Sequence, residues 1–492
     1  MSNTGYGLQT MPLIVGLSAS LRGSRHGIGL RDLSVELARC HDLNSLKAFL
    51  ETESGALLEA FNAARAKGVT FDEMYRDLRR STGLRGLSNC EVALAAALWG
   101  ALQEKVEIAC VNLSDHFPET GEPRNLGELR SLLMEADGLV LSGPVYFGDR
   151  SSVAQEFVHF LYGDPELQAH LRGRVFGGLA VGAKRNGGQE TTLIYQLLDM
   201  INLGMLGVGN DAGSTSQYGG TVVAGDVGTA ARDNYGLETS IDTGRRVARV
   251  VKGLEAGKKT GPAHAHVAIW LLQDSEDRRG FMLANRFVEQ LEQPGLTIQI
   301  SDFTREDVHR CIACDICPVR TGPTEEYRCI VTSRRDLFAR EHGALIKPDA
   351  VLLAAYSPRN KQKLESVYQR FIERTRYLRR DDYAIGDLLT APLVFSEIEA
   401  SQNLHLRMLT SMVRHHTILH RPLLGFEHQG EVLNWSSLVG QGQNFIDQAK
   451  RIRAARNAEQ GLLAAGREYV PVGYEISTEE KRRRVQAAQA GS

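Results

Sequence analysis

The sequence predicts an α/β protein with two doubly wound parallel sheets. Short apolar runs alternate with amphipathic helical patterns along most of the 492 residues, which is typical of parallel sheets covered by helices on both faces. At about 150 residues per domain, the length allows two or three hydrophobic cores. Residues 136–146 (ADGLVLSGPVY) are also echoed by residues 348–358 (PDAVLLAAYSP). Each of these segments is followed by a helical pattern, which indicates a degenerate internal duplication.

The first half, residues 1–252, contains four predicted strands and the helices between them. The strands are short apolar runs bounded by polar or glycine-rich turns. They lie at residues 13–17, 106–111, 138–141 and 175–181, and the helices at 91–104, 125–135, 153–161 and 191–203. Residues 27–87 carry two or three helical patterns where a single crossover would suffice. We interpret them as a helical insertion that forms a dimer contact, a surface elaboration or a lid.

The second half begins after a polar stretch of small residues, 253–265, which we predict to be a linker. Residues 266–456 then repeat the alternation of strands and helices. The predicted strands are 266–272, 297–300, 350–355 and 391–395, and the helices are 282–292, 364–375 and 445–456. Residues 457–492 form a tail whose basic run, 481–484, we expect to be solvated.

Composition narrows the choice of partner. The chain has 57 basic and 59 acidic residues, a net charge of −2, which gives no electrostatic reason to expect nucleic acid or a membrane surface. No run approaches the roughly 20 apolar residues that span a bilayer, and the start lacks the pattern of an export signal. We therefore expect a soluble, cytoplasmic protein. Glycine is in excess at 49 residues, and four of the seven cysteines are clustered.

Phosphate-binding features follow the first predicted strand. Ser18, Ser20 and Arg22 supply two hydroxyls and one cation directly after it, and hydroxyls, cations and helix N-termini are the groups that hold phosphate. Ser88 and Asn89 precede the long helix at 91–104, which suggests that the insertion splits one phosphate loop into two pieces that meet in space. The alternative for Ser88 is simple capping of that helix.

Two further loops follow the third and fourth strands. The first holds an aromatic pair between glycines, suited to stacking on a planar ligand, and the second is rich in glycine and opens a helix. Ligands of open α/β sheets bind at the carboxyl ends of the strands, so the three loops together predict a ligand site. The residues of the last two loops are Pro144, Val145, Tyr146, Phe147, Asn186, Gly187, Gly188 and Gln189.

From about residue 12 to residue 251, insertion excepted, the chain resembles the flavodoxin-like NAD(P)H-dependent FMN reductases, a family that includes quinone reductases and iron–sulfur flavoproteins. The resemblance implies a flavodoxin-like sheet of order 2-1-3-4-5 in each half, FMN as cofactor and NAD(P)H as reductant. It assigns the FMN phosphate to Ser18, Ser20, Arg22, Ser88 and Asn89, the ring face to residues 144–147 and the ring edge to residues 186–189. It also extends over residues 211–220, from which Tyr218 is added to the cofactor-binding residues. Ala19, where the family often has glycine, is a departure from the pattern.

The second half resembles this family more weakly and carries a cysteine cluster. Cys311, Cys314 and Cys317 are spaced by two residues, and Cys329 follows. Such spacing turns thiolates to one side of a short loop and suits a [4Fe–4S] cluster or a structural zinc. Unligated thiols are the third alternative. His309 is a substitute ligand or a surface residue.

Two other features of the second half point away from ligands. Residues 273–278 and 396–400 take the places of the first and last FMN loops, but the first carries three acidic residues that would repel phosphate and the second has no glycine. A second FMN is therefore not expected. His415, His416 and His420 lie in or just after a helical pattern at 404–419, and we interpret them as exposed or capping residues.

Three functions remain in view. The first is an NAD(P)H-dependent FMN oxidoreductase that passes electrons to a small-molecule acceptor such as a flavin, a quinone or a pathway substrate. The second is an iron–sulfur electron-transfer protein that serves a partner enzyme. The third is an unusual flavin reaction in a biosynthetic pathway. The resemblance implies a homo-oligomer, and no catalytic acid or base is assigned, because the cofactor carries the hydride chemistry.

Overall fold

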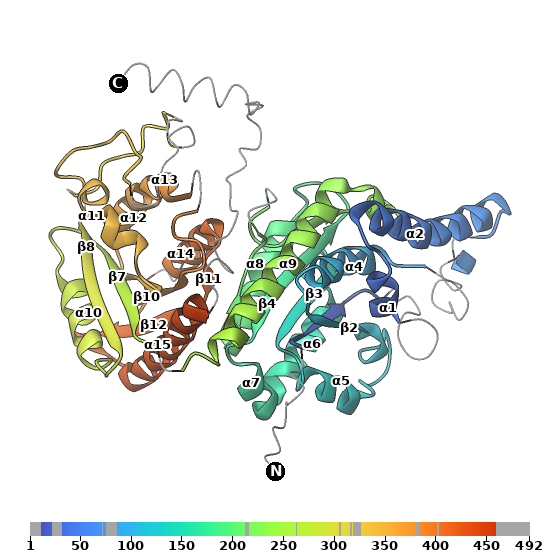
Figure 1. The fold of residues 1–492 in the computed structure, drawn as a ribbon, viewed down its shortest axis with the longest axis horizontal. Helices are drawn as coiled ribbons and strands as arrows, with labels where there is room; N and C mark the ends of the chain where they lie inside the picture. Colours follow the sequence, from blue (N-terminus) through green and yellow to red (C-terminus); the bar gives the residue numbers. More distant parts are fainter. Residues whose placement is uncertain are drawn as a thin grey trace, which may run out of the picture. The chain divides into compact units, whose positions relative to one another are not determined.

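The structure is a computed structural model that describes residues 11–21, 32–70, 72–74, 86–211, 216–261, 263–304, 307–314, 317, 326–379, 383–400 and 403–458. The chain divides into two compact units (Figure 1). The first unit comprises residues up to 199 together with 219–252, and the second comprises residues 200–218 together with those from 253 onward. The predicted boundary at residue 252 thus corresponds to that of the structure except that residues 200–218 group with the second unit.

The first unit is built on a parallel sheet of order β2-β1-β3-β4-β6. This is the order 2-1-3-4-5 of a flavodoxin-like fold. Nearly every residue of the inner strands is buried, as a parallel sheet covered on both faces requires. The strands are β1 (Leu13–Ser18), β2 (Glu107–Asn112), β3 (Gly138–Pro144), β4 (Val175–Gly182) and β6 (Gly220–Val223).

Helices cover both faces of this sheet. Neighbouring residues of a strand face opposite sides, and Gly177 lies against α9 whereas Gly178 lies against α8. Helix α4 crosses the sheet on the α9 side, where a side chain at Gly244 of α9 would collide with the α4 backbone. The helices are α4 (Asn89–Leu102), α5 (Leu126–Leu133), α6 (Ser152–Gly163), α7 (Pro165–Leu171), α8 (Gln189–Leu203) and α9 (Asn234–Gly257).

The described part of the insertion forms a further layer outside α4. Helices α1 (Leu33–Ala38) and α2 (Leu43–Ala66) both pack on α4 rather than on the centre of the sheet (Figure 1). The indole of Trp99 on α4 donates a hydrogen bond of 2.7 Å to the carbonyl of Cys40. Asp42 and Ser45 cap α2 reciprocally, which fixes where this helix begins.

The second unit has a parallel sheet of order β8-β7-β9-β10-β12, again 2-1-3-4-5. Trp270 of β7 meets Phe371 of α12 on one face, and Leu271 lies near Gly280 of α10 on the other. The central strands and helices are β7 (Ala265–Gln273), β8 (Leu296–Thr304), β9 (Ala350–Ser357), β10 (Leu389–Glu397), β12 (Leu423–His428), α10 (Arg279–Glu289), α11 (Leu337–Ile346), α12 (Gln362–Arg374), α13 (Arg376–Arg379), α14 (Leu404–Met412) and α15 (Trp435–Ala458). The short strands β5 (Leu206–Gly207), β11 (Ile418–Leu419) and β13 (Glu431–Val432) complete it.

Two predicted segments need correction. Residues 253–257 of the predicted linker continue helix α9, in which Leu254 is still buried. The helical pattern at 404–419 ends at Met412 and is followed by a short 3₁₀ turn that closes on His416, whose φ of 56° is left-handed. Apolar spacing alone did not reveal this stop, because strand β11 is only two residues long.

Candidate functional site at the carboxyl edge of the first sheet

The two halves of the predicted phosphate loop meet at Ser142, the fifth residue of β3. The backbone N–H of Ala19 donates to the carbonyl of Ser142 at 2.8 Å. The Ser142 hydroxyl in turn donates to the carbonyl of Cys90 at 2.8 Å, and Ser151 donates to the carbonyl of Ala19 at 2.9 Å. One strand end therefore holds the loop after β1 and the start of α4 side by side, as the split-loop prediction requires.

The side chains of this loop differ in their burial and in their hydrogen-bond partners. Ser18 is fully buried, and its hydroxyl has no hydrogen-bond partner among the described residues. Ser20 is also buried. Ser88 caps α4 in a reciprocal capping box with Glu91, so the capping alternative holds for its side-chain oxygen. Its hydroxyl hydrogen can still be donated to a ligand. Arg22 lies outside the described residues.

The side chain of Asn89 makes hydrogen bonds within the protein at both ends of its amide. Its amide nitrogen donates to the carbonyl of Asp226 at 2.9 Å, and its amide oxygen accepts from the N–H of Ala230 at 3.1 Å. Both ends of the side chain are thus engaged in holding the 226–230 segment against the start of α4. Its contribution to a phosphate site would come through the position of the loop and its backbone.

The aromatic loop after β3 is a tight hairpin with Phe147 at its tip. Tyr146 and Asp149 exchange two backbone hydrogen bonds of 2.8 and 2.9 Å. The two residues between them, Phe147 and Gly148, have φ values of 53° and 82°, the left-handed pair that two-residue hairpin turns require. Phe147 is fully exposed, and Tyr146 is 57% exposed. An apolar ring held out in a costly backbone conformation is a feature that ligand sites often retain.

The glycine-rich loop after β4 lies directly against this hairpin. Gly188 has a φ of 103°, and a Cβ placed on it would lie 2.7 Å from the Cα of Gly148. The backbone N–H of Val145 donates to the carbonyl of Val181 at 2.9 Å, which ties the two strand ends together. Asn186 also has a left-handed φ, of 58°. The two predicted ring loops are therefore in contact.

Gln189 shapes this loop from beneath. It is buried, its amide oxygen accepts from the N–H of Gly187 at 2.8 Å, and its amide nitrogen donates to the carbonyl of Lys184 at 2.8 Å. Its side chain thus holds the turn and does not extend over a ligand. The exposed members of the loop, Asn186 and Gly187, are the ones available to a bound ring.

These residues fit an FMN-sized ligand. Four features gather at the carboxyl edge of this sheet: a buried hydroxyl that has no partner among the described residues, the N-terminus of the fourteen-residue helix α4, an outward aromatic pair, and a close contact between glycines that leaves no room for a side chain. Hydroxyls and a helix N-terminus suit a phosphate, and the aromatic hairpin suits a flat ring.

Tyr218 is the predicted cofactor residue that stands next to the division between the two units. It belongs to the second unit, and it lies close enough to Tyr368 of α12 to contribute to raising the pKa of that phenol, behind the larger effect of burial. The glycine-rich segment 211–220 suggested a continuation of the FMN site, but the division between the units falls within it, between Tyr218 and Gly219.

The corresponding edge of the second sheet is filled by its own side chains. Arg279 pairs with Asp277 and Glu397, each at 2.8 Å, and its guanidinium lies over the ring of Tyr356. The hydroxyl of Tyr356 donates to Glu427 at 2.6 Å. This network joins Arg279 of α10 and Asp277 before it to the ends of β9, β10 and β12, at the edge that corresponds to the FMN loops of the first sheet.

The four clustered cysteines surround one small cavity in the second unit. Cys311, Cys314, Cys317 and Cys329 all line it. Among the residues that the structure describes, however, no three cysteine, histidine or acidic side chains are placed to hold a metal ion. Cys317 instead donates its proton toward Cys329. The sulfurs are gathered but are not arranged as ligands, and His309 is exposed.

A buried arginine polarises this cysteine pair. The hydrogen bond from Cys317, and behind it the Arg374 guanidinium at 3.0 Å from the sulfur, lower the pKa of Cys329 to about 5, while the same bond and burial raise the pKa of Cys317. Arg374 is held by Asp336 at 2.8 Å and by the hydroxyl of Tyr327 at 2.7 Å. This group was not predicted from the sequence, in which the basic run 374–380 (RTRYLRR) marks only its arginine.

The three histidines predicted to be exposed or capping, His415, His416 and His420, are buried, which corrects that part of their interpretation. The Nδ1 of His416 donates a hydrogen bond of 2.8 Å to the carbonyl of Asn210, and the residue closes the 3₁₀ turn. His420 pairs with the amide oxygen of Asn444 at 2.9 Å. His415 pairs with the Thr375 hydroxyl at 3.1 Å. Burial first, and then the charges of Arg379 and nearby groups, lower the pKa of His415 to about 3.

His415 makes stability depend on pH. The unfolded chain takes up a proton at an ordinary histidine pKa near 6.5, whereas the folded chain does so only near 3. The stabilisation is therefore complete above pH 6.5 and is lost as the pH falls toward 3, by about 5 kcal/mol at most. We expect His415→Gln to flatten the fall in unfolding free energy between pH 7 and pH 4, measured by urea titration. His159→Gln, at an exposed position, is the control and should leave the pH dependence of the unfolding free energy unchanged. The same pH dependence in the parent, His415→Gln and His159→Gln proteins would contradict the role given to His415.

No helix in the described parts of the chain is long and apolar enough to cross a membrane. The strand order and the loops at its carboxyl edge define the first unit as a flavodoxin-like α/β domain with a candidate flavin site. Residues 82–219 match the NADPH-dependent FMN reductase family. The resemblance predicted from the loops is therefore confirmed for this part of the chain.

Three relatives show how far the similarity extends. An iron–sulfur flavoprotein of Methanocaldococcus jannaschii is 39% identical over 130 residues, 26% of this chain and 65% of that protein. An NAD(P)H dehydrogenase (quinone) of Solidesulfovibrio magneticus is 28% identical over 135 residues, 25% of this chain and 66% of that one. An iron–sulfur flavoprotein of Methanosarcina thermophila is 26% identical over 195 residues, 36% of this chain and 97% of that protein. The chain thus covers slightly less than two thirds of the length of the first two.

Proposed function

We propose that the protein is an NAD(P)H-dependent FMN oxidoreductase whose first unit binds one FMN. The observation that carries the proposal is the meeting of three loops at the carboxyl edge of the first sheet, with the Phe147 hairpin packed against Gly188. The match of residues 82–219 to NADPH-dependent FMN reductases supports it. So do the relatives named as NAD(P)H dehydrogenase (quinone) and as iron–sulfur flavoproteins.

The chain's own residues would bind and orient the cofactor. Ser18, Ser88 and the backbone N–H groups at the start of α4 would hold the phosphate, aided by the positive end of the helix dipole. Tyr146 and Phe147 would flank the ring, and the exposed backbone at Gly187 would reach its edge. Bound FMN supplies the hydride and electron-transfer chemistry, so the protein contributes position and electrostatics rather than an acid or a base.

The test is the spectrum of the full chain purified with added FMN. We expect a yellow protein that retains about one FMN per chain after gel filtration and whose flavin absorbance NADH or NADPH bleaches under anaerobic conditions. Protein that elutes without flavin at every FMN concentration tried would contradict the proposal. Reoxidation of the reduced protein by free flavin or by a quinone would then identify the class of acceptor.

An iron–sulfur electron-transfer protein is the second candidate, favoured by one observation: Cys311, Cys314, Cys317 and Cys329 line one cavity. In this case the hydrogen bond between Cys317 and Cys329 would have to break so that the sulfurs could become ligands of a cluster. Binding of a zinc ion would require the same rearrangement. Iron, zinc and acid-labile sulfide measured on anaerobically purified protein decide between these arrangements. A Cys314→Ser variant should lose the metal while it retains FMN, and absence of all three analytes in the parent protein would remove this candidate.

A further inference from the structure

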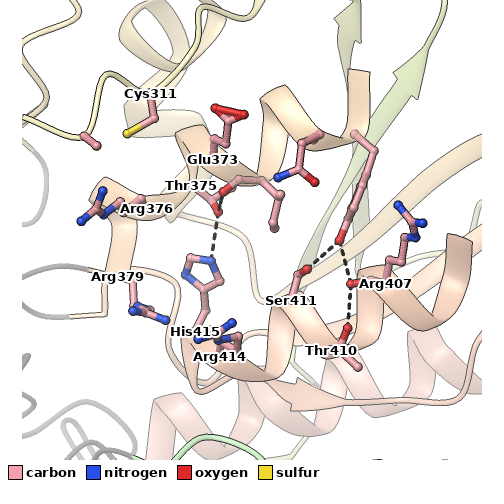
Figure 2. Close-up of a pocket in the computed structure, with 14 residues that line it drawn as sticks. Cys311, Glu373, Thr375, Arg376, Arg379, Arg407, Thr410, Ser411, Arg414 and His415 are labelled. Atoms are coloured by element: carbon pink, nitrogen blue, oxygen red, sulfur yellow. Dashed lines mark hydrogen bonds between the residues drawn. The ribbon is translucent and has the colours of Figure 1, made fainter. Parts of the chain in front are cut away.

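The second unit contains a large cavity lined by arginines, separate from the flavin loops and unassigned by the proposed function. It has a volume of about 700 Å³, within the range of sites for small organic ligands. Figure 2 shows its wall, formed by α12, α13 and α14 and by the loop that carries Cys311. The described lining includes four arginines and one carboxylate, that of Glu373. The arginines are Arg376, Arg379, Arg407 and Arg414.

A neutral group holds two of these arginines in place. The amide oxygen of Gln217 accepts from Arg414 at 2.6 Å and from Arg379 at 3.2 Å. An amide oxygen orients a guanidinium without cancelling its charge, unlike a carboxylate. Arg407 has a carboxylate, that of Glu365, only at 4.0 Å. Gln217 therefore holds two cationic side chains of the cavity wall in position.

The titration of His415, which also lines the cavity, reflects this charge. Beyond the effect of its burial, Arg379 and Arg414 each disfavour its protonation and lower its pKa. Three charged or titratable groups thus act on the ring, namely Arg379 of α13 and, from its own 3₁₀ turn, Arg414 and His416. The imidazole stays neutral, so the cationic groups among the described lining residues are the four arginines.

We propose that this cavity binds a small organic polyanion, a molecule with two or more carboxylate or phosphate groups. Arginine is the side chain suited to such groups, because its planar guanidinium donates two parallel hydrogen bonds to one carboxylate or phosphate. Arg376 and Arg379 on α13 and Arg407 and Arg414 from the α14 side would grip a ligand from two sides (Figure 2). Cys311 and Arg376 also line the cysteine cavity, so the bound anion would lie next to the cysteine cluster.

The experiment is calorimetric titration of the full-length protein with two probes, pyrophosphate and succinate, at low and at high salt. We expect at least one probe to bind at low salt and to weaken as salt rises. Preference for pyrophosphate would indicate a phosphorylated ligand, and preference for succinate a polycarboxylate. Arg376→Gln and Arg379→Gln should each weaken binding about tenfold or more, since each removes a charge-assisted hydrogen-bond donor.

The controls keep the outcome decisive. Arg340→Gln removes the same charge from α11, outside the cavity, where Arg340 meets Glu341 at 3.4 Å, and should bind the probes as the parent does. Arg407→Gln changes an exposed side chain and serves if a variant on α13 does not fold. Each titration is repeated with excess FMN. Loss of binding in that arm would place the anion in the phosphate loop of the first unit; that result, equal affinity in the cavity variants, or no heat with either probe would overturn the proposal.

Discussion

Asp336→Asn is expected to lower the free energy of unfolding by about 3–5 kcal/mol, the cost typical of breaking a buried ion pair from one side. Asp336 is fully buried and Arg374 is 1% exposed. One carboxylate oxygen accepts from Arg374 and caps α11 through the N–H of Ala339; the other accepts from the N–H of His309. An asparagine retains the first set of bonds but turns an NH₂ group toward the N–H of His309 and leaves the guanidinium charge without a partner.

The measurement is denaturant unfolding of Asp336→Asn beside a matched exposed pair. Glu276 and Lys363 meet at 2.6 Å, shorter than the buried pair, but their side chains are 76% and 58% exposed. Glu276→Gln should therefore change the unfolding free energy by less than about 1 kcal/mol. Adding Arg374→Met to Asp336→Asn should recover part of the loss. Equal effects of the buried and exposed substitutions would contradict a central role for the buried pair.

Gly188→Val is expected to weaken FMN binding at least about tenfold, which corresponds to roughly 1.4 kcal/mol. A side chain there meets the Cα of Gly148 at 2.7 Å in a backbone conformation, φ 103°, that a β-branched residue rarely adopts. Overpacking and strain of this kind cost about 1–3 kcal/mol. The loop must then move away from the Phe147 hairpin and open the space predicted to hold the flavin ring.

Flavin fluorescence titration checks this expectation. Gly127→Ala is the control, because Gly127 lies in α5 with open space around its Cα and an ordinary φ; FMN affinity should not change. Unaltered affinity in Gly188→Val, with unfolding free energy also unaltered, would show that the contact between the two loops does not shape the flavin site.

The strands and ligand loops of the first unit could be predicted from sequence because their signals are local. A buried parallel strand is an apolar run, and a ligand loop carries glycine and hydroxyl residues at its end; Ser18 and Gly188 were found in this way. Arg374 could not be identified, because its partners Asp336 and Cys329 lie 38 and 45 residues away in the chain. Tyr218 was assigned to the flavin site by its neighbours in sequence, and this assignment stays a prediction, since the chain returns to the first unit only at Gly219.

The ion-pair network around Arg279 has a consequence for how much cofactor each chain carries. Two sheets of the same strand order stand in one polypeptide, and paired side chains occupy the carboxyl edge of the second. Saturated protein should therefore hold one flavin for two flavodoxin-like sheets, half the ratio expected if both edges were open. The ratio of flavin to protein in this molecule thus reports the number of sheet edges that bind flavin, not the number of domains.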